Sequence, residues 1–207
     1  MSVRVSQPLE LPREAVQGVA SGIFFLAFFG GAWALWGTSF LRGALHIGVY
    51  VIIGLVTLVF FGIGVMVMRC ARTLSPATAP EDVATGRRIG IWFGVVFGAE
   101  AVLIALASIL LSNFGADRLL APVIALIVGI HFLPLARLFS VRPYYLTGTL
   151  LCLLALIAII ALLLGLQIAG PSPDNWSYFV GIGAALVLWL TLLYLSGYAI
   201  GLMRQGA

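Results

Sequence analysis

Six long apolar stretches, separated by short polar segments, make up almost the whole chain. A helix needs roughly 20 mainly apolar residues to cross the hydrocarbon core of a bilayer, and each stretch is about that long. The pattern therefore predicts an all-α bundle of six transmembrane helices, with spans at about 15–37, 43–68, 89–112, 119–137, 144–168 and 176–202.

The polar segments between the stretches are too short to hold a second domain. The longest, RCARTLSPATAPEDVATGRR at 69–88, has a composition typical of a loop. We therefore expect residues 1–207 to form a single integral membrane domain of three successive helical hairpins. The first apolar stretch is of spanning length and follows Glu14 directly, so we interpret it as a retained span and not as a secretory signal.

Composition supports a bilayer as the main environment of this chain. Hydrophobic residues make up 62% of the sequence and charged residues 9%, whereas soluble domains average about 45–50% and about 25%. The lipid bilayer is thus the expected partner of most of the surface. The net charge of +4 does not by itself indicate an anionic partner, because its meaning depends on where the arginines lie along the chain. No nucleic-acid partner is expected.

The arginines predict which side of the membrane each connection occupies. If the N-terminus is cytoplasmic, nine arginines lie on the inner side and only Arg42 and Arg118 on the outer side. Such a bias follows the positive-inside rule, so we predict that both termini are cytoplasmic. The inner set is Arg4, Arg13, Arg69, Arg72, Arg87, Arg88, Arg137, Arg142 and Arg204.

Glu100 and His131 are the candidate chemical groups within the spans. Glu100 lies twelve residues past Arg88, about 18 Å along a helix, which is near the midplane, where an isolated charge costs at least about 2.5 kcal/mol. His131 lies about 9 Å from the inner end of the next span. Helical side chains lean toward their own N-terminus, so these two lean toward each other and are expected to meet directly or through water. Pro134 leaves the carbonyl of Ile130 without its helical donor and completes the predicted polar site.

Small residues recur at helical spacing in the third span. Side chains of this size allow two membrane helices to approach closely. Contact with another helix of the same bundle is the favoured interpretation, and a dimer interface is the alternative. The helix-packing stripe consists of Gly90, Gly94, Gly98, Ala101 and Ala105.

Three segments, WFGVVFGAEAVLIALASILL, LLAPVIALIVGIHFLPLARLF and YYLTGTLL, lie within residues 88–160. This region resembles a group of small uncharacterised bacterial multi-pass membrane proteins. The resemblance implies no activity. It implies that Glu100, His131 and Pro134 belong to one module. The use of arginine without lysine indicates a GC-rich bacterial genome, so the bacterial cytoplasmic membrane is the expected location.

Two classes of function remain open. A protein that moves or senses a small solute or a proton would use the site at Glu100 and His131. A non-catalytic scaffold or accessory subunit would instead bind a membrane partner, or a second copy, through its glycine-rich helix faces. The chain contains no HExxH, GxSxG or Walker pattern, so enzymatic activity is not favoured and neither a metal nor a cofactor is expected.

Overall fold

The computed structural model describes residues 13–74, 80–169 and 174–205 of the chain. Six of its helices are long and apolar enough to cross a membrane, which confirms the predicted all-α, six-span fold. A short 3-10 helix, η1, precedes the fourth span. In chain order the elements are α1 (Arg13–Gly37), α2 (Gly43–Ala71), α3 (Pro80–Asn113), η1 (Asp117–Leu119), α4 (Leu120–Phe139), α5 (Pro143–Leu163) and α6 (Asn175–Gln205).

Helix α3 begins earlier than the sequence pattern predicted. The composition of residues 69–88 predicts a loop, but residues 80–88 form the first turns of α3. Proline is well suited to the first position of a helix because its missing N–H has no partner there in any case, and Pro80 occupies that position. Pro80 therefore indicates the start of a helix, and the residues that follow it are helical although their composition is typical of a loop.

Helix α5 ends earlier than predicted, at Leu163 and not near residue 168. Gly165 has a left-handed backbone with φ of 70°, a conformation that glycine adopts without steric cost. The amide of Leu166 donates to the carbonyl of Ala161 at 2.8 Å, and the amide of Gly165 donates to Leu162 at 3.1 Å. These two bonds form a Schellman motif, which satisfies carbonyls that the helix end would leave unpaired.

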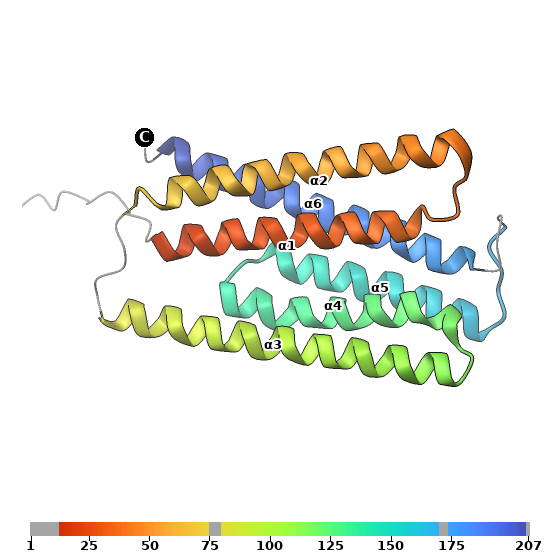
Figure 1. The fold of residues 1–207 in the computed structure, drawn as a ribbon. Helices are drawn as coiled ribbons and strands as arrows, with labels where there is room; N and C mark the ends of the chain where they lie inside the picture. The colour runs from red at the N-terminus through yellow and green to blue at the C-terminus, as the bar shows by residue number, and fades with distance from the viewer. Residues whose placement is uncertain (1–12, 75–79, 170–173, 206–207) are drawn as a thin grey trace, which may run out of the picture.

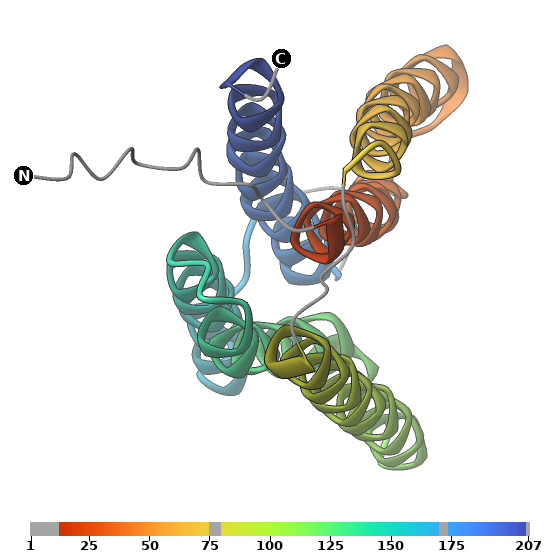
Figure 2. The ribbon, with the colours of Figure 1, turned by 90° about the vertical axis from the view of Figure 1, so that its left-hand side faces the viewer.

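The six helices form two groups that meet along α6. Helix α1 packs against α6 and α2, while α4 packs against α5 and α3; α6 then contacts both α4 and α5. Viewed along the helices, α2 and α3 lie apart from each other at the outside of the bundle (Figure 2). The start of α1 and the end of α6 lie at the same end of the molecule (Figure 1). We call this the first end, and the opposite one the second end.

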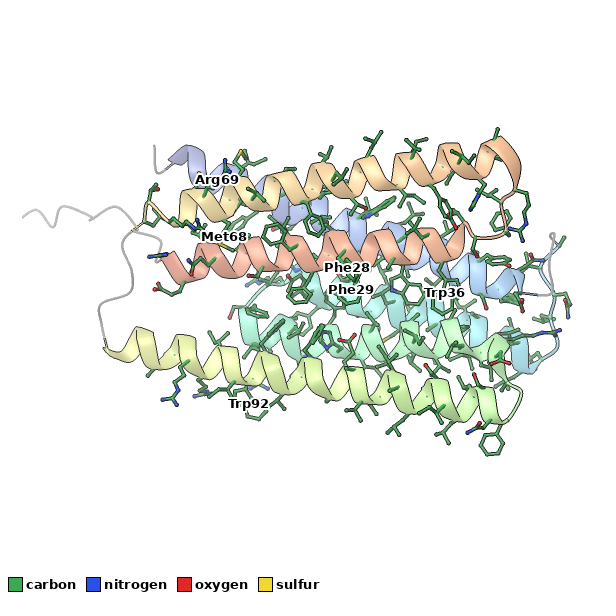
Figure 3. All side chains as sticks on the ribbon, in the orientation of Figure 1. Phe28, Phe29, Trp36, Met68, Arg69 and Trp92 are labelled. Atoms are coloured by element: carbon green, nitrogen blue, oxygen red, sulfur yellow. The ribbon has the colours of Figure 1, made fainter. Side chains whose placement is uncertain are left out.

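Helix α3 is the most peripheral of the six. None of the residues in its most apolar 18-residue stretch is buried, whereas half of the corresponding stretch of α6 is. Its backbone packs mainly along α4, and its link to α1 runs through phenylalanine rings. Phe97 lies 5.3 Å from Phe25 and 6.4 Å from Phe29, measured between ring centroids. Figure 3 shows Phe29 on the side of α1 that faces α3 and α4.

Two pairs of glycines mark where helix backbones come closest. A Cβ built on Gly148 of α5 would lie 2.6 Å from the carbonyl oxygen of Gly129 on α4. A Cβ built on Gly181 of α6 would lie 2.6 Å from the Cα of Gly37 on α1. Close backbone approach of this kind lets membrane helices gain dispersion contacts, so these pairs fix the α4–α5 and α1–α6 packing.

Candidate functional site

Glu100 of α3 and His131 of α4 meet in the interior of the bundle. The Oε2 atom of Glu100 lies 3.2 Å from the Nδ1 atom of His131. Their side chains are 11% and 8% exposed, respectively. The sequence left open whether the two residues touch or are bridged by water, and the structure places them in direct contact.

Helix direction explains how two residues at different predicted depths can touch. Helices α3 and α4 are consecutive and antiparallel, and α4 packs along α3. The Cα–Cβ bonds in a helix tilt toward its N-terminus, so the two side chains lean toward each other along the bundle axis. The backbone of Val96, one turn before Glu100, also lies beside the imidazole.

Aromatic rings pack against the imidazole of the pair. The His131 ring lies 6.1 Å from Phe97 and 5.8 Å from Phe132, both in edge-on arrangements. Phe97 in turn contacts the α1 phenylalanines, Phe25 among them. A carboxyl and an imidazole are thus held in an apolar surrounding, in which electrostatic interactions are stronger than in water.

The Glu100–His131 contact is close, but it is not an aligned hydrogen bond. The Nδ1 atom of His131 is buried, and within the described part of the chain it has no hydrogen-bond partner. The 3.2 Å separation meets the distance of an ion pair, so the misfit lies in the angle between donor and acceptor and not in their distance.

Pro134 lies inside α4, one turn after Ile130, and the helix continues through it. Its ring is exposed on the outer surface of the bundle. The structure therefore brings Glu100 and His131 together but does not place the Pro134 side chain with them. The free carbonyl of Ile130 stays a prediction.

The helix-packing stripe of α3 does not contact another described helix. A Cβ built on Gly90, Gly94 or Gly98 would meet no atom within 4 Å, and Ala101 and Ala105 are exposed. The favoured interpretation, packing inside the bundle, is therefore wrong for this face. The bundle is held instead at the glycine pairs of α4–α5 and α1–α6, which the sequence analysis did not identify. A stripe of small residues can lie against another helix or on the outer face of the bundle, so its spacing alone does not show which of the two it occupies.

One further polar contact and one unpartnered polar atom in the interior were not predicted. The hydroxyls of Thr147 on α5 and Thr191 on α6 lie 2.6 Å apart, and either one can donate to the other. The hydroxyl that accepts this bond can donate its own proton to a carbonyl of its own helix, that of Pro143 or Val187. The Nε1 atom of Trp189 is buried without a hydrogen-bond partner among the described residues. It lies 2.7 Å from the position that a Cβ on Gly30 would take. Isolated polar residues in apolar runs are a signal for such contacts, but their partners cannot be read from one sequence.

A hollow of about 490 Å³ opens at the second end of the molecule, between η1 and the end of α5. Its polar lining residues include Asp117, Arg118 and Gln167, and neither Glu100 nor His131 borders it. This hollow is therefore separate from the Glu100–His131 site.

No protein-family model, curated protein or solved structure matches this chain. The resemblance of residues 88–160 to a group of bacterial membrane proteins thus stays a prediction. Within residues 13–74, 80–169 and 174–205, no three His, Cys, Asp or Glu side chains are grouped so that they could hold a metal ion.

Proposed function

We propose that this multi-pass membrane protein moves protons through Glu100 and His131. The observation that supports this function is the 3.2 Å contact between a carboxyl and an imidazole within two apolar spans. Ionisable residues inside membrane spans are rare and costly, and they commonly serve ion pathways or proton relays.

The proposed step is the transfer of one proton within the pair. The proton leaves Oε2 of the Glu100 carboxylic acid and binds the lone pair of Nδ1 on a neutral His131, giving a carboxylate and an imidazolium. The imidazolium then releases the proton that its Nε2 atom carries. Histidine suits this role because its two ring nitrogens can accept a proton on one side and release one on the other.

The burial of the pair favours a proton over a larger solute. Both side chains are about nine-tenths covered, and phenylalanine rings pack around them. A solute would need a cavity beside the pair, whereas a proton can move along hydrogen bonds after small side-chain rotations. We place this function in the bacterial cytoplasmic membrane, in line with the arginine distribution and the resemblance.

Proton flux into reconstituted vesicles tests this function. A pH-sensitive dye inside the vesicles should report acidification after an imposed pH gradient with the native protein. Glu100→Gln and His131→Gln should each reduce the rate to that of protein-free vesicles. Asp117→Asn makes the same acid-to-amide change at the second end and should keep the native rate. Equal rates for the native protein and Glu100→Gln would show that the proposal is wrong.

A second candidate function is supported by the exposed glycine face of α3. A membrane scaffold or accessory subunit would present such a face to a partner helix or to a second copy, because a surface without side chains allows close backbone approach. Gly90, Gly94 and Gly98 have open space above them. Native mass spectrometry from mild detergent should then show an assembly that Gly94→Leu dissociates. A native protein that is monomeric and carries no partner would exclude this candidate.

A further inference from the structure

Three arginines lie close to the first end of the molecule on the α3–α4–α5 side. Arg87 and Arg88 belong to the early turns of α3, and Arg142 is the N-cap residue of α5. All three side chains are exposed.

The α3 arginines and Arg142 lie at similar levels along the bundle. The rings of Phe93 on α3 and Phe139 at the end of α4 lie 5.9 Å apart, which fixes the register of the two helices. Arg88 is five residues before Phe93, about 7.5 Å further toward the first end. Arg142 follows Phe139 by three residues, just past the turn that joins α4 to α5.

Among the described side chains, none compensates the positive charge of these arginines. No ion pair joins any of the three to a carboxylate among the described side chains. Arg142 also lies at the N-terminus of α5, where the helix itself carries a partial positive charge and a cation is unfavourable. Arg137, by contrast, lies in the last turn of α4, where the helix dipole favours it.

Arg88 and Arg142 are each followed, about one helical turn further from the first end, by an exposed aromatic side chain. Trp92 follows Arg88 by four residues and is 52% exposed, and Tyr145 follows Arg142 by three residues and is 47% exposed. Figure 3 shows Trp92 extending from α3 away from the rest of the bundle. Trp and Tyr are enriched where headgroups meet acyl chains, so these rings place the three arginines at headgroup depth.

We infer that Arg87, Arg88 and Arg142 form a surface that binds the phosphate of anionic phospholipid headgroups. Guanidinium groups match phosphate oxygens through paired N–H donors. The phosphate would supply a negative charge beside these guanidinium groups, while Trp92 and Tyr145 would pack against the upper acyl chain. This inference is independent of the proposed proton function, because it involves neither Glu100 nor His131.

Lipid retention measured by native mass spectrometry tests this surface. The full-length protein is incubated in detergent micelles that contain equal amounts of phosphatidylglycerol and phosphatidylcholine. The native protein should retain phosphatidylglycerol in preference to phosphatidylcholine. Replacing Arg87, Arg88 and Arg142 together by glutamine should lower the affinity for phosphatidylglycerol about fivefold per arginine, because each basic residue near an anionic surface contributes about that factor.

Arg118→Gln is the matched control, because Arg118 is exposed in η1 at the second end of the molecule. It should retain phosphatidylglycerol as the native protein does. Circular dichroism of the triple variant shows whether its helices are intact; if they are not, the three single variants are compared in its place. A native protein without preference for phosphatidylglycerol, or the same loss in Arg118→Gln as in the triple variant, would overturn the inference.

Discussion

Gly129 on α4 and Gly148 on α5 face each other so closely that a Cβ on Gly148 would lie 2.6 Å from the carbonyl oxygen of Gly129. No flexible side chain end can yield at this point, because the obstacle is helix backbone. The separation of two helices therefore depends on the absence of one methyl group at residue 148.

The same substitution is expected to have opposite effects at two glycines. Gly148→Ala should lower the free energy of unfolding in detergent by about 1–3 kcal/mol, since overpacking forces the backbones apart. Gly94→Ala places its methyl group in open space and should be neutral, or stabilising by up to about 1 kcal/mol, because alanine favours helix more than glycine does. A loss at Gly94 as large as that at Gly148 would mean that α3 packs along its glycine face.

Glu100 and His131 are expected to be energetically coupled. Glu100→Gln and His131→Gln each leave a nearly buried polar partner without its native contact, which costs about 1–3 kcal/mol. The double variant should cost less than the sum of the two single variants, by about 0.5–3 kcal/mol. Unfolding free energies of the four proteins in mixed micelles give this coupling directly. Strict additivity would contradict the contact at 3.2 Å.

Trp189 is expected to tolerate the loss of its N–H group but not the loss of its ring. The Nε1 atom is buried without a hydrogen-bond partner among the described residues, so Trp189→Phe removes an unsatisfied donor and should change stability little or increase it. Trp189→Ala leaves a void beside Gly30 and should cost about 3–5 kcal/mol. Thermal unfolding of both variants tests the difference. A large loss for Trp189→Phe would show that the indole N–H has a partner in the membrane.

The arginine distribution predicts the orientation of the bundle. Reporter fusions in the connection between α2 and α3 and at the C-terminus should both report the cytoplasm, and a fusion in the connection between α5 and α6 should report the outside. The structure requires the first two positions to lie on the same side, because α2 ends and α6 ends at the first end of the molecule (Figure 1). Two fusions at the first end that report different sides would contradict the six-span fold itself.

Hydrophobic length predicted the number of helices, because a bilayer imposes the same minimum on every span. It predicted their ends less well. The start of α3 at Pro80 and the end of α5 at Leu163 depend on local backbone bonding, which apolar composition does not report. The Glu100–His131 contact could be predicted from side-chain direction, which follows from helix geometry and offsets the different depths of the two residues.

The packing surfaces could not be predicted in the same way. In a membrane, the hydrophobic pattern does not distinguish a face that meets lipid from a face that meets another helix, because both are apolar. Gly94 and Gly148 are alike in sequence terms, yet one lies in open space and the other against backbone. Only the three-dimensional arrangement of α3, α4 and α5 separates the two.

The peripheral position of α3 has a consequence for biosynthesis. A chain is made from its N-terminus, so α3 is complete before α4 has been translated. Until then Glu100 has no imidazole to face, and a carboxyl near the middle of a lone span is costly in lipid. Helix α3 is apolar enough to cross a membrane by itself, but its burial in lipid should become more favourable once His131 arrives about 31 residues later. The two helices are therefore expected to settle in the bilayer together, as one hairpin.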